Sequence, residues 1–223
     1  MTLTGYWPLT GTSGEAYDHS GRDNHGTLLG GVSQGAKGLL GENSHSFDGV
    51  DGRIRHDYRT SPSFTVNVWM HSAQSTWNAT GAGWSDRSAS GFIIHPDGDE
   101  SGWSGYVLEN TKDGYYKIGS YTADNVDSWN MYTITHENNT GTSRMFFNGE
   151  QVMSKVTTTS RVVNTNTGTL GHDDMDSYSA SERALEGRIA EARYYSRPLT
   201  GSEIRYLYSI KSRGLHTSSS KSS

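Results

Sequence analysis

The 223-residue chain contains no cysteine, so no disulfide framework holds its fold together. The hydrophobic core must supply the stability alone, and a chain of this length can bury enough surface to do so. No apolar run approaches the ~20 residues of a membrane-spanning helix, which argues against a membrane span. The first residues have no basic start, apolar stretch or cleavage site, so we expect no secretory leader.

Positive charge is also scarce. Lysine and arginine together number 19 against 24 acidic residues, and the formal net charge is −5. Such a chain is a poor partner for nucleic acid or for an anionic membrane. Only 32% of the residues are apolar, whereas 27 are glycine. This composition is typical of many short strands joined by many turns, and we expect an all-β fold.

Sequence motifs of catalysis are missing as well. The chain has no cysteine nucleophile, no G-x-S-x-G, no H-E-x-x-H and no phosphate-binding glycine loop. Glycoside hydrolysis needs two closely placed carboxylates, and neither E-x-D-x-x-E nor E-x-D-x-E occurs. The nine histidines are scattered along the chain. We predict that the protein is not an enzyme.

Alternation of apolar and polar residues predicts several strands. In residues 64–70 the side chains of Phe64, Val66, Val68 and Met70 share one face. A hairpin is predicted at residues 148–149, because Asn-Gly accepts the positive φ angles of a type I′ turn. By contrast, residues 71–105 break the strand pattern.

The last structured stretch combines a strand with a short helix. Alternation over residues 185–195 places Ala190 with Ala192 and Tyr194 on one face, and Ile189 on the opposite face. A helix follows, because Thr200 with Glu203 three residues later forms a capping box. Its expected apolar face contains Ile204, Leu207 and Tyr208.

Short motifs along the chain resemble those of the laminin-G-like, concanavalin-A-like jelly-roll family, in that family's order from residue 5 to about residue 209. The resemblance implies one two-sheet antiparallel β-sandwich with a short C-terminal helix. We assign the domain to residues 1–209 and a Ser-rich arm to residues 210–223. The matching motifs are Trp7-Pro-Leu9, Asp18-x-Ser20-Gly21-x-x-Asn24-x-Gly26, Phe47-Asp-Gly49, Phe64–Trp69, Asn148-Gly149, Gly168-Thr-Leu-Gly171 and the strand and helix after Leu185.

The glycine-rich loop after the first strand offers oxygen ligands of the kind that calcium prefers. Asp18, Ser20 and Asn24 carry these oxygens at plausible spacing. In the resembling family this loop lies close to a late acidic pair and commonly holds a structural Ca²⁺. Here that pair is Ala190-Glu191, so one expected carboxylate is missing. The alternative is a loop closed by bonds from its own side chains to its backbone.

Three tryptophans lie among small and polar residues in the stretch that breaks the strand pattern. Trp77, Trp84 and Trp103, with nearby Asp86 and Arg87, could offer a sugar an aromatic plane and polar partners. Tryptophan on a loop also anchors protein partners, or its ring folds back and caps an open end of the sandwich. The other three tryptophans are expected in the core: Trp7, Trp69 and Trp129.

The leading functional hypothesis is a non-enzymatic recognition module that binds a glycan or a host-surface receptor. Such a module works outside the cell, and with no leader in view we expect it on a virion surface, as a decoration, fibre or receptor-binding protein in a homo-oligomer or larger assembly. One alternative is a structural spacer or capsid ornament that binds no sugar. Another is an accessory carbohydrate-binding module of a secreted enzyme.

Overall fold

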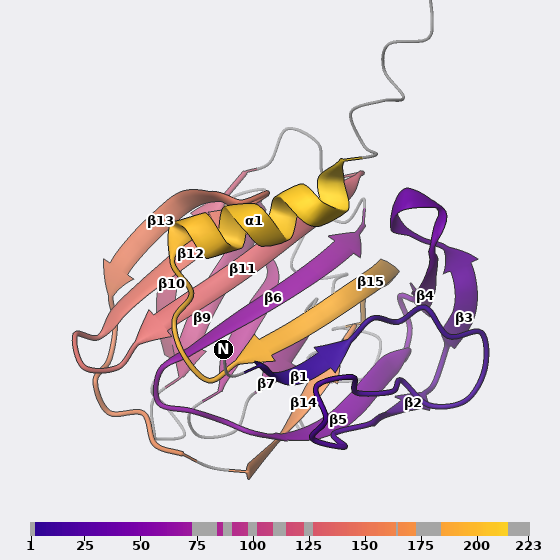
Figure 1. Cartoon of the computed structure of the whole chain (residues 1–223), viewed down its shortest axis with the longest axis horizontal. Helices are drawn as coiled ribbons and strands as arrows, with labels where there is room; N and C mark the ends of the chain where they lie inside the picture. The colour runs from indigo at the N-terminus through magenta and orange to yellow at the C-terminus, as the bar shows by residue number, and fades with distance from the viewer. Residues whose placement is uncertain are drawn as a thin grey trace, which may run out of the picture.

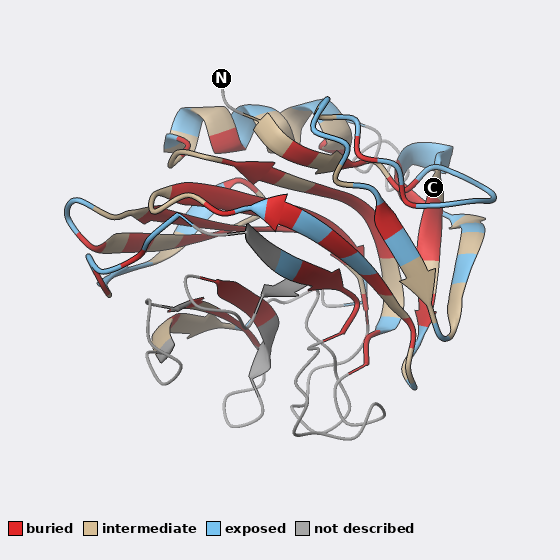
Figure 2. Cartoon of the chain, turned by 90° about the horizontal axis from the view of Figure 1, so that it is seen from below, coloured by how far each residue is buried: buried red, intermediate tan, exposed pale blue. Residues whose placement is uncertain are grey.

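The computed structural model describes residues 3–72, 84–86, 91–97, 102–108, 115–122, 127–163, 165–172 and 184–213. Within these ranges the chain forms fifteen strands, one 3-10 turn and one α-helix. The strands make two antiparallel sheets, and Figure 2 shows the helix and the two sheets as successive layers. The all-β sandwich expected from the sequence is confirmed. No helix in the described ranges is long and apolar enough to cross a membrane.

The first sheet has eight strands and is organised around β15 (Glu186–Tyr195). One edge of β15 pairs with β6, while its other edge pairs with β4 along its first half and with β1 along its second half. The order across this sheet is β13 (Glu150–Val156), β12 (Thr142–Phe147), β11 (Trp129–Glu137), β6 (Phe64–His71), β15, β4 (Asn43–Asp48) and β3 (Val32–Lys37), with β1 (Leu3–Trp7) beside β15.

The second sheet has seven strands and covers one face of the first. Part of it lies in residues 71–105, where the sequence shows no strand pattern, so the expectation of loops there is wrong. One strand in that stretch has only three residues, and the other two contain proline or glycine, which hides the alternation. The order across this sheet is β10 (Tyr115–Tyr121), β9 (Gly102–Leu108), β8 (Phe92–Asp97), β7 (Trp84–Asp86), β14 (Thr165–Leu170), β5 (Arg53–Arg59) and β2 (Gly26–Leu29).

The main hydrophobic core lies between the two sheets. The residues predicted to share one face of β6 all belong to it, and none is more than 1% exposed. Aromatic rings from both sheets meet here, with Phe64 of β6 and Phe92 of β8 at 5.7 Å between ring centroids. Trp7 is fully buried in this core, as the sequence predicts.

A second core lies on the opposite face of the first sheet, under α1 (Gly201–Ser212) and the turn η1 (Leu39–Gly41). Figure 1 shows the helix crossing this face over β11, β12 and β13. Ile204 is fully buried here, and Tyr208 stacks on fully buried Trp69 with 5.5 Å between centroids. Trp129 packs partly buried against the same cluster. The helix therefore covers part of the outer face of the first sheet.

The local signals at the helix and the hairpin are confirmed. The Thr200 side chain accepts from the Glu203 amide, and the Glu203 carboxylate accepts from the Thr200 amide. Asn148 and Gly149 both have positive φ, at 50° and 88°. The helix ends at Ser212, three residues beyond the expected domain boundary at residue 209.

The predicted face assignment of β15 is wrong for two residues. A β-bulge between Ile189 and Glu191 shifts the register against β6. Ile189 therefore lies in the inter-sheet core with Ala192 and Tyr194, whereas Ala190 lies on the helix side. Simple alternation cannot reveal a bulge, because the extra residue reverses the pattern at one point only.

We predict that Ile204→Ala lowers the free energy of unfolding by about 2–5 kcal/mol, since it leaves a cavity between the helix and the sheet. Urea unfolding followed by tryptophan fluorescence measures the change. The neighbouring Arg205 is exposed, so Arg205→Ala should change stability by less than about 0.5 kcal/mol. Equal effects of the two substitutions would contradict the buried position of Ile204.

Candidate functional site

Trp103 does not lie at the surface. Its side chain is 1% exposed, and its ring packs against Tyr132 with 5.0 Å between centroids, inside the inter-sheet core. The predicted role of Trp103 in ligand contact is therefore wrong, because its ring lies in the inter-sheet core and Trp103 belongs to strand β9. Its indole Nε1 has no hydrogen-bond partner within the described ranges.

Of the other four residues predicted to contact a ligand, two lie within the described structure. Trp84 and Asp86 are the first and last residues of β7, which pairs with β8 and β14. Trp84 thus belongs to a strand and not to a loop. Trp77 and Arg87 lie outside the described residues, so ligand contact by Trp77, Trp84, Asp86 and Arg87 stays a prediction.

The Asp18 carboxylate is the centre of the loop between β1 and β2. Its Oδ1 accepts from the amides of Tyr6 and Ser20, both at 2.8 Å. Its Oδ2 accepts from the Ser20 hydroxyl at 2.8 Å and from the amide and side chain of Asn24 at 3.1 and 3.2 Å. Burial alone would raise the pKa of Asp18, but these hydrogen bonds outweigh it and lower the pKa.

Glu191, the fourth residue of the expected calcium site, is held by a different set of partners. Its side chain is 2% exposed, lies 2.9 Å from Nε of Arg193 and accepts from the Tyr6 hydroxyl at 3.2 Å. Lys211, near the end of α1, lies 3.7 Å from it. Glu191 therefore helps to hold the helix against the sheet.

These four residues fit a calcium ion poorly. Both oxygens of Asp18 already accept from N–H and O–H donors, and Glu191 is neutralised by cations. Calcium would have to displace those donors to gain its six to eight oxygens. Across the described part of the chain, no group of three or more acidic or histidine side chains is placed to hold a metal. Calcium stays a prediction, and the hydrogen-bonded loop is the arrangement that the contacts favour.

We predict that Asp18→Asn lowers the free energy of unfolding by about 1–3 kcal/mol, because an amide cannot accept on both of its atoms. Asp23→Asn on the same loop is the control, since Asp23 is exposed. If hydrogen bonds alone hold the loop, adding calcium or a chelator leaves the melting temperature of the wild type unchanged. A melting temperature that rises with calcium in the wild type but not in Asp18→Asn would support the metal site instead.

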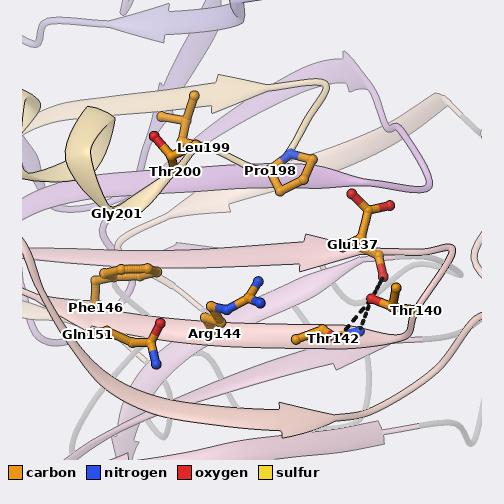
Figure 3. Close-up of a pocket in the computed structure, with 10 residues that line it drawn as sticks. All are labelled: Glu137, Thr140, Thr142, Arg144, Phe146, Gln151, Pro198, Leu199, Thr200 and Gly201. Carbon is orange, nitrogen blue, oxygen red and sulfur yellow. Dashed lines mark hydrogen bonds between the residues drawn. The ribbon is translucent and has the colours of Figure 1, made fainter.

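A polar groove lies on the outer face of the first sheet, beside the start of α1. Its volume is about 490 Å³, and Figure 3 shows the side chains around it. One side is the face of β11, β12 and β13, and the other is the loop that leads from β15 into the helix. The lining residues are Glu137, Thr140, Thr142, Arg144, Phe146, Gln151, Pro198, Leu199, Thr200 and Gly201.

The strand geometry explains why these side chains meet. Thr142, Arg144 and Phe146 alternate along β12 and point away from the inter-sheet core, while Met145 points into it. Glu137 of β11 pairs directly with Thr142, and the β12–β13 pairing brings Gln151 beside Phe146. In Figure 3, Arg144 lies between Phe146 and Thr142 along the strand.

The loop side of the groove is held firmly. The Thr65 hydroxyl donates to the Arg197 carbonyl at 2.9 Å and accepts from the Leu199 amide at 2.8 Å. The Arg197 guanidinium donates to the Glu203 carboxylate at 2.9 Å. The hydrogen bonds from Arg197 and the Thr200 amide lower the pKa of Glu203 to about 2. The groove is thus preformed on its loop side.

Three side chains in the groove keep hydrogen-bonding capacity that the protein does not use. In the described structure the Arg144 guanidinium and the Gln151 amide make no hydrogen bond or ion pair. The Glu137 carboxylate accepts from Ser63 and Asn139 at Oε1, which leaves Oε2 without a partner among the described residues. These groups are donors and acceptors available to a ligand.

A second groove of similar volume lies on the other side of the helix, between α1 and β1. Its lining is mainly apolar, and its charged groups are already paired, Arg193 with Glu191 and Glu203 with Arg197. It therefore offers little to a polar ligand. The main apolar residues that line this second groove are Leu3, Tyr6, Tyr195, Leu199, Tyr206, Leu207 and Ile210. The groove beside β12 is therefore the better candidate site.

Sequence reasoning did not find this groove. Arg144 and Gln151 flank the predicted Asn148-Gly149 turn, Glu137 lies in no predicted strand, and nothing in the spacing of the three residues marks them as a group. The one available signal is the alternation of Thr142, Arg144 and Phe146, which predicts a shared face but not what covers it.

The family comparison decides the identity of the fold. Residues 23–205 match the model of the concanavalin A-like lectin/glucanases superfamily. The chain belongs to this superfamily. The resemblance drawn from the sequence motifs is therefore confirmed. A sequence comparison with curated proteins found no match.

Solved structures with this superfamily fold match nearly the whole chain at low sequence identity. Domain 4 of AbnA, a GH43 extracellular arabinanase from Geobacillus stearothermophilus in complex with arabinotriose, has a TM-score of 0.71 and 19% identity. That match covers 93% of this chain and 98% of the arabinanase domain. The binding domain of botulinum neurotoxin serotype D has a TM-score of 0.68 and 14% identity, over 94% of this chain and 52% of its own. This chain thus spans about half the length of the neurotoxin binding domain.

We predict that the ion pair at the groove makes stability depend on acidic pH. The pKa of Glu203 is about 2 in the folded protein against an ordinary value of 4.5, so its contribution is present above pH 4.5 and is lost as the pH falls toward 2. The pKa of Asp18 is also lowered, so the contribution of Asp18 to stability is likewise lost as the pH falls. The difference between wild type and Glu203→Gln in urea unfolding should therefore shrink from pH 6 to about pH 2.5. A constant difference would contradict this assignment.

Proposed function

We propose that this domain is a non-enzymatic recognition module that binds a glycan in the polar groove beside β12. The observation that carries the proposal is the unused hydrogen-bonding capacity of Glu137, Arg144 and Gln151 around one preformed hollow. Sugar hydroxyls both donate and accept, so they can meet a carboxylate, a guanidinium and an amide together. The groove volume of about 490 Å³ lies in the range of small-ligand sites.

Structural relatives support a glycan or a surface receptor as the partner. The arabinanase domain is in complex with arabinotriose, and one neurotoxin binding domain is in complex with SialylT. Another relative is in complex with rat synaptotagmin II, so a protein receptor is the second candidate partner. At 14–19% identity these likenesses bear on the fold, and the groove residues carry the argument for the ligand.

The groove also supports binding without catalysis. Glycoside hydrolysis uses an acid and a base or nucleophile, two carboxylates held on either side of the scissile bond. Glu137 is the single carboxylate among the residues that line the groove. The described lining of the groove therefore offers no second carboxylate to act as base or nucleophile.

The remaining predictions concern the setting of the module. Trp77 and Trp84, with Asp86 and Arg87, are proposed as a second contact region for the same ligand or receptor.

The role as a virion decoration, fibre or receptor-binding protein on a particle surface, in a homo-oligomer or larger assembly, is likewise a hypothesis. Immunogold labelling of particles tests the virion role, and light scattering tests the oligomeric state.

A glycan array followed by titration calorimetry tests the proposed site. We expect the wild type to bind a set of glycans and the double variant Glu137→Gln with Arg144→Met to bind them at least about tenfold more weakly, because two charge-assisted contacts are lost. Arg22→Met is the matched control. Arg22 is exposed and makes no hydrogen bond or ion pair in the described structure, so this variant should bind like the wild type.

Two outcomes would count against the proposal. Failure of the wild type to bind any glycan would favour the structural spacer. Glycan binding that survives in the double variant but is lost in Trp77→Ala or Trp84→Ala would move the site to the tryptophan region. Circular dichroism and the melting temperature of each variant establish that it is folded.

A further inference from the structure

The groove carries two opposite charges that do not neutralise each other. Glu137 and Arg144 lie on adjacent strands in diagonal positions, because Glu137 pairs with Thr142 and Arg144 is two residues further along. Diagonal neighbours in an antiparallel pair are roughly 7–8 Å apart. The two side chains form no ion pair within 4.0 Å. Both charges therefore remain available to whatever enters the groove.

We infer that the groove selects a neutral oligosaccharide segment, laid along β12, over sialylated or otherwise charged sugars. The inference rests on the proposed function and adds the class of glycan. It depends on the presence of both Glu137 and Arg144 in the groove, since either charge alone would favour a ligand of the opposite sign.

Charge complementarity decides between the classes. A sugar carboxylate that approached Arg144 would also stand near the Glu137 carboxylate, whose repulsion offsets part of the attraction to Arg144. An amino sugar that approached Glu137 would meet the Arg144 guanidinium in the same way. A neutral hydroxyl can donate to Glu137 Oε2 and accept from Arg144, so it satisfies both groups without adding a charge.

The shape of the groove favours more than one sugar ring. The outward-facing residues of β12 extend from Thr142 to Phe146, which is roughly 13 Å at about 3.3 Å per residue. That length exceeds a single sugar ring. Gln151 lies toward one end and Glu137 toward the other, so polar contacts are spread along the groove. An oligosaccharide can use contacts at both ends, whereas a monosaccharide cannot.

Matched neutral and anionic saccharides test this inference. The array carries arabinotriose, cellotriose and lactose beside trigalacturonic acid and sialyllactose, and calorimetry measures the affinity for lactose and sialyllactose. We expect the wild type to bind lactose about tenfold or more tightly than sialyllactose, and to bind the neutral trisaccharides in preference to trigalacturonic acid. Glu137→Gln should shrink or reverse that preference, because it removes the repelling charge and keeps the oxygen that accepts from Ser63 and Asn139.

Arg22→Met is the control and should leave the preference unchanged. Equal or tighter binding of the anionic saccharides by the wild type would overturn the inference, while the proposed function would stand. A preference that is the same in Glu137→Gln as in the wild type would also overturn it. If the wild type binds none of the saccharides on the array, the proposed function fails and this inference fails with it.

Discussion

The backbone hydrogen bonds of β15 join strands from three distant parts of the chain. β15 pairs with β1, β4 and β6, so the N-terminal strand, the early hairpin and the central strand are all held by one late segment. The strand then leads directly into the helix that covers the sheet. This segment therefore holds the middle of the first sheet together. It also positions the helix over the outer face and the loop that forms one wall of the groove.

The outer face of the first sheet is divided into a buried part and an open part. Helix α1 lies over Trp69, Met131 and Phe146 and buries them. Next to the helix start the cover ends, and Glu137, Arg144 and Gln151 remain at least partly exposed. The groove is this border between covered and uncovered sheet, and its loop wall is fixed by the hydrogen bonds of Thr65. A binding surface on rigid strands with a pinned wall loses little conformational entropy on binding.

Local patterns were reliable where local chemistry sets the conformation. The Thr200 capping box, the Asn148-Gly149 turn and the buried face of β6 follow from short stretches of sequence, because each depends on near neighbours along the chain. The same reasoning misplaced Ile189, since the bulge in β15 arises from pairing with a distant strand. It also misplaced Trp103, whose polar sequence neighbours do not reveal that its ring faces the opposite sheet.

The sequence by itself determined the fold class, the family and the hydrophobic faces of the principal strands, because alternation and turn residues act over a few positions. Only the tertiary structure decided that both carboxylate oxygens of Asp18 accept hydrogen bonds from the protein. It also decided that Glu137, Arg144 and Gln151 line one groove. Those three residues come from three strands and are brought together by pairing and by the cover of α1. A side chain is free for a ligand only when its neighbours in space leave it unpaired, and neighbours in space are a property of the folded chain.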